Sequence, residues 1–211
     1  MSLPEGVERR VFDGTERFAT RGEPVYGEPT DGPWRAWNPH RSKLGAMLEL
    51  GLDTGLVGGE TTLYLGAAAG TTVSHVADFA GPTYAVEFAA RPMRDLLDAA
   101  ESRPRLYPLL ADARSPEEYA HVVEPVDVVV QDVATRGQAA VATTNARFLR
   151  EDGRLLVAIK ARSEDVTRDP EGIFEDALAE LRAAYEVLET ERLAPYHDDH
   201  LGAVARPVDG R

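Results

Sequence analysis

Charged side chains follow several strand-like runs of this sequence, at the positions where parallel α/β sheets bind ligands. The run TTLYL leads into Gly66 and a Gly/Ala-rich turn, and Glu87, Asp112, Asp132 and Lys160 end or follow the next four runs. In an open α/β sheet the ligand binds beyond the carboxyl ends of the strands, near the point where strand order reverses. An acid about 20 residues beyond the turn, as Glu87 is, typically accepts ribose hydroxyls. Asp112 can accept from an adenine amino group or cap the helix that follows.

Lys43 and Lys160 are the only lysines among 23 cationic residues, and the other 21 are arginines. A lysine ammonium is compact and its pKa can be tuned, whereas a guanidinium stays charged. The sequence therefore raises the question why these two lysines are kept. A lysine at a strand end, as Lys160 is, is most often solvated, but in a chain so poor in lysine Lys160 becomes a candidate for chemistry.

The turn at residues 66–70 does not read GxGxxG. It lacks the middle glycine that lets a dinucleotide pyrophosphate approach the backbone, so a nicotinamide cofactor is disfavoured. S-adenosylmethionine needs a ribose acid, an adenine contact and polar groups for its amino-acid end, but no pyrophosphate cradle. The set predicts a class I methyltransferase, although the turn by itself is equally explained as a tight strand-to-helix connection.

The elements that must position these residues alternate along residues 44–211. Apolar strand runs and amphipathic helices in alternation are typical of an open, mostly parallel sheet. Predicted strands cover 61–66, 83–88, 106–110, 126–133, 153–161, 186–194 and 200–208, and predicted helices cover 71–79, 91–101, 116–122, 137–149 and 170–185. The last two strands are joined by a short loop and predict an antiparallel finish. We therefore expect a Rossmann-like α/β fold with a mostly parallel seven-stranded sheet whose last strand is antiparallel.

Residues 1–43 differ from the rest and predict a small β-rich lobe with a connector, followed by a methyltransferase domain over 44–211. The first region holds seven cations and seven acids, so the whole net charge of −13 lies in the second. Trp34 and Trp37 occur near the end of the lobe, where we expect them to pack rather than to stack on bases.

Length and composition exclude several classes of protein. The chain has 211 residues with 43% hydrophobic residues, enough for one main core and unlike a disordered chain. It has no cysteine, which excludes thiolate catalysis and disulfides, and its histidines show no metal-ligand spacing. No apolar run is long enough to span a membrane and no signal peptide is evident, which predicts a cytoplasmic protein. The acidity and loss of lysine favour adaptation to a salt-rich cytoplasm over an ordinary acidic protein.

Three histidines are expected to be structural. His75 lies on the predicted helix 71–79 and is expected to pack, His121 ends a helix, and His40 neighbours a basic turn.

Successive blocks of the chain resemble archaeal fibrillarin-like 2′-O-methyltransferases. The blocks are RAWNPHRSKLGA, YLGAAAGTTVSHVADF, TYAVEFAARPMRDLL, LLADARSPEEY, VDVVVQDVA, AIKARSEDVTRDPEGIF and PYHDDH, in that order. The run GTTVSHVADF after YLG is the most specific of them. Together with the scarcity of lysine and the excess of acidic residues, this resemblance points to a halophilic archaeon.

The resemblance implies roles for individual residues. The implied S-adenosylmethionine contacts are Gly66, Thr71, Thr72, Glu87, Phe88, Asp112, Ala113, Asp132, Val133, Ala134 and Thr135. The implied catalytic set is Lys43, Asp132, Lys160 and His200, with Asp132 positioning the Lys160 ammonium and His197 as an additional candidate. The chain departs from the family at Thr135, where a glutamine is usual.

The resemblance also implies an activity and partners. The activity is guide-directed ribose 2′-O-methylation of rRNA and possibly tRNA, in a box C/D particle with guide RNA, target RNA, a scaffold protein and a kink-turn-binding protein. A chain at −13 binds RNA poorly by itself in concentrated salt, so partners must supply affinity. The expected local RNA or partner contacts are Arg9, Arg10, Arg17, Arg35 and Arg41. The alternatives are a non-catalytic cofactor-binding assembly subunit and, disfavoured, a small-molecule methyltransferase or a nicotinamide oxidoreductase.

Overall fold

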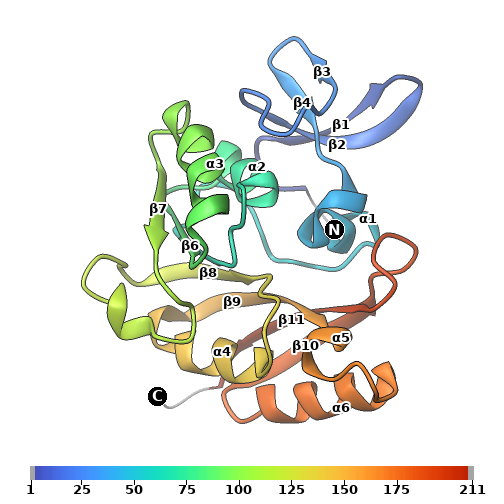
Figure 1. Cartoon of the computed structure of the whole chain (residues 1–211). Coiled ribbons are helices and arrows are strands. Elements are labelled where there is room, and N and C mark those ends of the chain that lie inside the picture. The colour runs from blue at the N-terminus through green and yellow to red at the C-terminus, as the bar shows by residue number, and fades with distance from the viewer. Residues whose placement is uncertain (1–2, 209–211) are drawn as a thin grey trace.

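A large mixed sheet and a small antiparallel sheet form the frame of the protein (Figure 1). The computed structural model describes residues 3–208, so the outer residues of the two predicted regions, 1–2 and 209–211, lie outside it. Within the described part of the chain, no helix is both long and apolar enough to cross a membrane.

The large sheet has seven strands in the order β10-β11-β9-β8-β5-β6-β7. Their bounds are β5 Thr62–Leu65, β6 Thr83–Glu87, β7 Leu106–Leu110, β8 Val126–Gln131, β9 Leu149–Lys160, β10 Tyr185–Arg192 and β11 His200–Pro207. The neighbours from β9 to β7 pair in parallel, and β11 pairs antiparallel with both β9 and β10. The predicted sheet, with its antiparallel last strand, is confirmed. Strand order reverses between β5 and β8, which places a ligand site at their carboxyl ends.

Helices cover both faces of this sheet. They are α1 Lys43–Glu49, α2 Thr71–Phe79, α3 Ala90–Glu101, α4 Gln138–Asn145, α5 Ala161–Glu164 and α6 Pro170–Leu181. One apolar core lies under α1, α2 and α3, and a second lies under α4 and α6. The strands between them are apolar on both faces, as parallel strands covered by helices must be.

Some predicted elements are shorter than expected, and two helices were not predicted. The predicted helix 137–149 ends at Asn145 and continues as the 3-10 turn η3 Ala146–Phe148, and the predicted helix 116–122 is only the 3-10 turn η2 Pro116–Glu118. The helices α1 and α5 have seven and four residues, too few for a helical period to be recognised in sequence.

The small sheet comprises β1 Val7–Phe12, β2 Thr15–Arg21, β3 Thr30–Asp31 and β4 Trp34–Ala36 in the order β1-β2-β4-β3. The 3-10 turn η1 Pro39–Arg41 connects it to α1. Trp34 and Trp37 are buried, as expected for packing residues. The Trp37 ring stacks on buried His75 of α2 at a centroid distance of 4.9 Å, so His75 packs as predicted and joins the two sheets' cores.

The prediction that Arg35 contacts RNA or a partner is wrong. Its side chain is fully buried between the two lobes, where it ion-pairs with Glu28 and with Asp78 of α2 at 2.5 and 2.8 Å. Asp78 also binds buried Arg103 at 2.9 Å. Sequence shows a cation but not its burial, and here the guanidinium fastens the small sheet to α2.

Asp78→Asn will lower the free energy of unfolding by about 3–5 kcal/mol, because it leaves the buried Arg103 guanidinium without its counter-ion and leaves Arg35 with Glu28 alone. Asp78 is 2% exposed between Arg35 and Arg103. The measurement is denaturant unfolding in molar KCl. Asp176→Asn is the matched control, since Asp176 pairs with Arg168 at the surface and its loss should cost at most about 1 kcal/mol. Equal effects of the two substitutions would contradict the prediction.

Candidate active site

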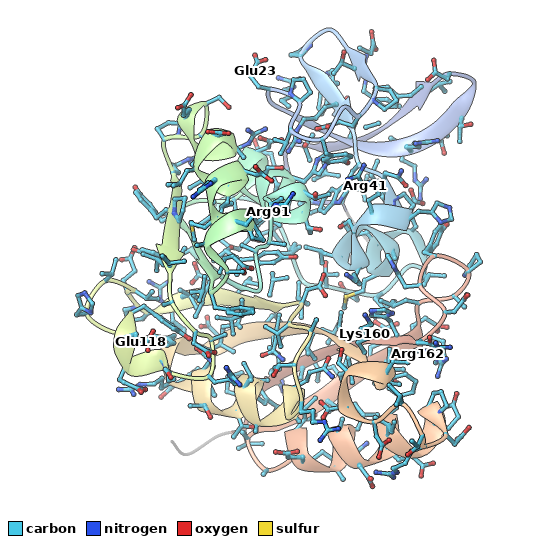
Figure 2. The ribbon with its side chains drawn as sticks, in the orientation of Figure 1. Glu23, Arg41, Arg91, Glu118, Lys160 and Arg162 are labelled. Atoms are coloured by element: carbon cyan, nitrogen blue, oxygen red, sulfur yellow. The ribbon has the colours of Figure 1, made fainter. Side chains whose placement is uncertain are left out.

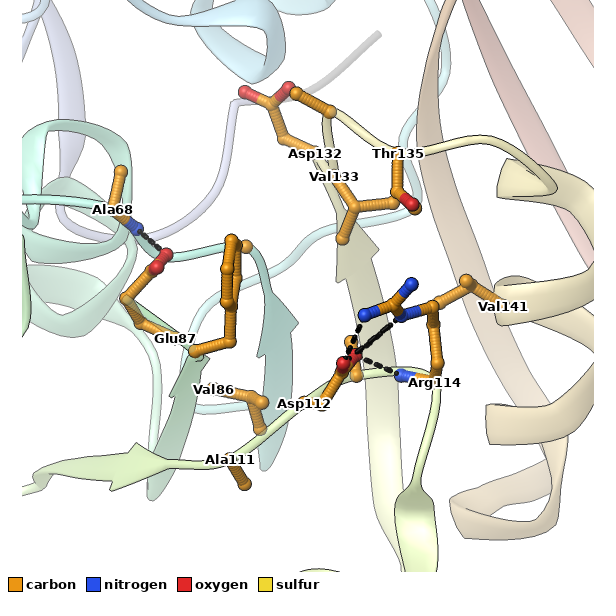
Figure 3. Close-up of a pocket in the computed structure, with 14 residues that line it drawn as sticks. Ala68, Val86, Glu87, Ala111, Asp112, Arg114, Asp132, Val133, Thr135 and Val141 are labelled. Carbon is orange, nitrogen blue, oxygen red and sulfur yellow. Dashed lines mark hydrogen bonds and ion pairs between the residues drawn. The ribbon is translucent and has the colours of Figure 1, made fainter. Parts of the chain in front are cut away.

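A cavity of about 460 Å³ opens at the carboxyl ends of β5, β6, β7 and β8, where the strand order reverses (Figure 3). Nine predicted cofactor residues line it: Gly66, Glu87, Phe88, Asp112, Ala113, Asp132, Val133, Ala134 and Thr135. The structure therefore brings together residues spread over 70 positions of sequence, from Gly66 to Thr135. This volume is in the range of small-molecule sites.

Glu87, the last residue of β6, is 7% exposed and holds the turn after β5. Its Oε2 accepts from the Ala68 amide at 2.9 Å and its Oε1 accepts from the Ala89 amide at 2.8 Å. Each carboxylate oxygen retains a lone pair, so Glu87 can still accept two hydroxyls of a ribose. The next side chain, Phe88, is 72% exposed and lines the cavity, where its ring can cover a planar ligand.

The turn at residues 66–70 needs its glycine. Gly66 has φ +84°, and a Cβ there would collide with the Asp132 carbonyl of the β8 end. Ala68 also has a positive φ, +48°, a strained conformation for a residue with a Cβ, held by its bond to Glu87. The backbone is therefore bent to keep the cavity open between β5 and β8.

Asp112 and Ala113 follow β7 on the opposite wall. Asp112 pairs with exposed Arg114, and this guanidinium holds the pKa of the carboxyl below its usual range, so Asp112 stays ionised. Ala113 is 9% exposed, and its carbonyl accepts from buried Asn145 at 2.8 Å. This wall presents one acceptor and a fixed backbone edge, which fits an adenine.

Lys43 and Asp132 meet at the edge of the cavity, with Nζ 3.0 Å from Oδ2. Ser42 sets the start of α1 by accepting from the Gly45 amide and from Trp37 Nε1, each at 2.9 Å. Lys43 thus reaches the site from the small lobe's connector. The expectation was that Asp132 positions Lys160, whereas the carboxylate pairs with Lys43.

Lys160 and His200 are cross-strand neighbours on β9 and β11, and Lys160 stands directly before α5 (Figure 2). His200 Nδ1 is buried and has no hydrogen-bond partner within residues 3–208. Burial and the nearby Lys43 lower the pKa of His200 to about 4, so its ring is neutral at neutral pH. His197 packs edge-on against His200, and its Nε2 donates to the Pro39 carbonyl at 2.8 Å.

Two predicted cofactor residues do not line the cavity. Thr71 and Thr72 begin α2; Thr72 is 7% exposed, and Thr71 lines a separate hollow with Tyr26 and Arg41. Thr135 lines the cavity in place of the family's usual glutamine.

Five cavity residues escaped the sequence prediction: Ala68, Val86, Ala111, Arg114 and Val141. Four of them are small or apolar and carry no chemical signal, and Arg114 enters only because it folds back onto Asp112. No group of three or more metal-ligating side chains occurs in the described part of the chain.

The residues present fit S-adenosylmethionine. Glu87 still has a free lone pair on each oxygen for a ribose, Phe88 offers an uncovered ring, and Asp112 with Ala113 forms a polar edge opposite. The Lys43 and Asp132 pair lies at the edge of the cavity, directly beyond the end of β8.

A sequence profile described as Fibrillarin matches residues 9–208. The chain belongs to the fibrillarin family. It is 75% identical over 207 residues to a fibrillarin-like rRNA/tRNA 2'-O-methyltransferase of Haloarcula marismortui, covering 98% of this chain and 99% of the relative. The predicted resemblance to a halophilic archaeal fibrillarin is confirmed.

Solved fibrillarin structures share the whole fold. A fibrillarin from a fibrillarin/Nop5p complex is 38% identical with a TM-score of 0.91, covering 99% of this chain and 100% of that one. Aeropyrum pernix fibrillarin, with natively bound S-adenosyl-L-methionine, is 43% identical with a TM-score of 0.84, covering 95% and 94%. The N-methyltransferase NodS of Bradyrhizobium japonicum, at 19% identity and a TM-score of 0.61, shares only the fold. The predicted class I methyltransferase fold is thus confirmed for this fibrillarin.

Stability of this fibrillarin will decline as pH falls below about 6.5, because buried His75 and half-buried His200 are neutral when folded. Burial lowers the pKa of His75 well below 6.5 and that of His200 to about 4. The unfolded chain binds more protons than the folded chain in this window, so the contribution is complete above pH 6.5 and lost toward pH 4. Unfolding free energies at several pH values will show it, and His200→Gln will flatten the slope. An unchanged slope in that variant would contradict the assignment to His200.

Proposed function

We propose that the chain transfers the methyl group of S-adenosylmethionine to ribose 2′-hydroxyls of RNA, as the catalytic subunit of a box C/D particle. What supports this is a nucleoside-sized cavity lined by Asp132, whose carboxylate pairs with Lys43, together with Lys160 and His200 as cross-strand neighbours on β9 and β11. Family membership and the activity named for the 75% identical relative support methyl transfer.

The cofactor would be held by the cavity. Glu87 accepts the ribose hydroxyls, Phe88 covers the adenine, and Asp112 with Ala113 contacts its edge. Asp132, Val133, Ala134 and Thr135 close the opposite side with Gly66, and Thr71 and Thr72, at the start of α2, remain candidates for the methionine end. When bound, S-adenosylmethionine supplies an activated sulfonium methyl group.

The chain's residues must orient the hydroxyl and remove its proton. Lys160 stands nearest this role, because Asp132 is engaged by Lys43 and no carboxylate pairs with Lys160 in residues 3–208. Lys160 either orients the 2′-hydroxyl or accepts its proton. Asp132 holds Lys43 at the edge of the cavity, and His200 supports substrate placement beside Lys160. Alignment of the two reactants supplies most of the acceleration.

RNA is selected by partners rather than by this chain. Net charge −13 opposes phosphate binding, and of the predicted arginine contacts Arg9 and Arg10 are engaged by acids. Arg17 and Arg41 remain, and the Arg41 guanidinium lies exposed over the Tyr26 ring. Base pairing to a guide RNA supplies specificity, and a scaffold protein, such as the Nop5p of the related complex, with a kink-turn-binding protein supplies affinity.

We propose that residues 1–43 position the connector that carries Lys43, and that residues 44–211 form the methyltransferase domain. Trp37 and Ser42 carry this coupling through their hydrogen bond. We place the protein in the cytoplasm, where its RNA targets are.

The test is transfer of labelled methyl to a guide-specified ribose by the chain assembled with guide RNA, scaffold and kink-turn-binding proteins in molar KCl. Transfer to one guide-selected ribose, absent with a mismatched guide, is the expected result. Cofactor binding without transfer would favour the non-catalytic assembly subunit, and methyl transfer to a free metabolite without RNA would favour a small-molecule enzyme.

A further inference from the structure

Buried Gln138 and half-buried Glu164 form a polar link between the cavity and the end of β9, and neither has a role in the proposed methyl transfer. Gln138 begins α4 and is 0% exposed, and Glu164 ends α5, the single turn after Lys160. Fully buried amides are retained only where their hydrogen bonds are satisfied.

The Gln138 side chain binds both backbone groups of Lys160. Its Oε1 accepts from the Lys160 amide at 2.8 Å, and its Nε2 donates to the Lys160 carbonyl at 3.0 Å. A peptide group of a neighbouring strand would make the same kind of contacts. The second Nε2 hydrogen is donated to Glu164 Oε1 at 2.8 Å, so both hydrogens and the oxygen of the side-chain amide have partners.

Lys160 needs this substitute because β8 has already ended beside it. The last residue of β8, Gln131, pairs with Val157, three residues before Lys160. The next amide of the chain, that of Ala161, donates to Asp199 on the β11 side at 3.0 Å. The amide and carbonyl of Lys160 therefore point away from β11, toward the side where β8 would continue. There the Gln138 side chain takes the place of the missing strand.

Glu164 connects the same amide to the cavity wall. Its two carboxylate oxygens accept from the Gly137 and Gln138 amides, each at 2.8 Å. These amides lie where the loop 132–137 passes into α4. The loop carries Asp132, Val133, Ala134 and Thr135 into the cavity. Gln131 Nε2 closes the ring by donating to the Gln138 carbonyl at 2.8 Å.

We propose that Gln138 and Glu164 are positioning residues for methyl transfer. Gln138 fixes the backbone from which the Lys160 ammonium projects, and Glu164 fixes both Gln138 and the loop that lines the cavity. One hydrogen-bond network thereby sets the distance between Lys160 and the loop 132–137 that lines the cofactor cavity. This inference rests on the proposed function.

Gln138→Met tests the Gln138 contacts because it preserves volume and removes all three side-chain hydrogen bonds. Glu164 still binds the backbone amides of residues 137 and 138, so cofactor affinity should change by less than about 3-fold. Single-turnover methyl transfer at saturating cofactor should fall about 10–100-fold, since displacements near 1 Å cost up to that much. Glu164→Gln should weaken cofactor binding as well, because its NH₂ group would face one of the two backbone amides that the carboxylate oxygens now accept from. Glu175→Gln, which removes an exposed carboxylate on α6, is the matched control and should leave both unchanged.

The two lysines allow a direct readout that does not depend on activity. Protein labelled with ¹⁵N-lysine has only two lysine amide signals, those of Lys43 and Lys160. In Gln138→Met the Lys160 amide should shift and exchange with solvent at least about 10-fold faster, while the Lys43 amide stays in place as an internal reference. Equal changes at both amides would indicate general loosening of the fold.

The outcomes separate the two proposals. A Gln138→Met particle with wild-type transfer rate, or with an unchanged Lys160 amide, would overturn the positioning role. A loss of rate matched by an equal loss of cofactor affinity would also overturn it. An inactive wild-type particle would instead overturn the proposed function, and the positioning for methyl transfer with it, while the lysine signals would still decide whether Gln138 holds the Lys160 backbone.

Discussion

Lys160→Arg will reduce methyl transfer at least about 100-fold, equivalent to about 2.7 kcal/mol of transition-state stabilisation, while cofactor affinity stays within about 3-fold. The substitution keeps the positive charge, so the acidic surface and the Asp132–Lys43 pair are undisturbed. What it removes is the compact amino group, which a wide planar guanidinium cannot replace in orienting the hydroxyl or in accepting its proton. The measurement is single-turnover transfer by the assembled particle.

A nearby arginine, Arg162, supplies the matched control. Arg162→Lys makes the reverse exchange two positions away, at a side chain that is 70% exposed and pairs with Asp199. It should leave the transfer rate within about 2-fold, because exposed ion pairs contribute little. If Lys160→Arg were as active as Arg162→Lys, Lys160 would serve only as a positive charge.

Glu87→Gln will weaken S-adenosylmethionine binding about 100-fold, because hydrogen bonds to charged groups contribute about 1.5–3 kcal/mol each. The carboxylate accepts from the Ala68 and Ala89 amides with different oxygens. A glutamine has one acceptor oxygen, and its NH₂ group would face an amide donor. The substitution therefore removes a ribose acceptor and also frees Ala68 from its positive φ conformation.

Calorimetric titration of the isolated chain in molar KCl measures this loss. Glu117→Gln, an exposed acid on η2, is the control for removing one negative charge and should bind as wild type does. Weakening of equal size in both variants would show that the effect comes from overall charge and not from the Glu87 contacts.

The sequence by itself determined the fold class, the cavity and most of its lining. Strand runs and amphipathic helices carry their own periodicities, so the order of elements was readable, and an open parallel sheet brings its strand ends to one edge. That is why Glu87, Asp112 and Asp132 were found together although their spacing in the chain is large. The rarity of lysine then directed attention to Lys43 and Lys160.

Only the tertiary structure decided which charges meet and which are buried. In sequence, nothing distinguishes Arg35 from Arg41. In the structure Arg35 is buried in an ion pair with Asp78, whereas Arg41 is exposed. Asp132 pairs with Lys43 of the small lobe and not with Lys160 of the neighbouring strand, and Gln138 supplies the strand neighbour that Lys160 lacks. These contacts join residues 22 to 89 positions apart and carry no period, so they depend on how helices and lobes pack over the sheet.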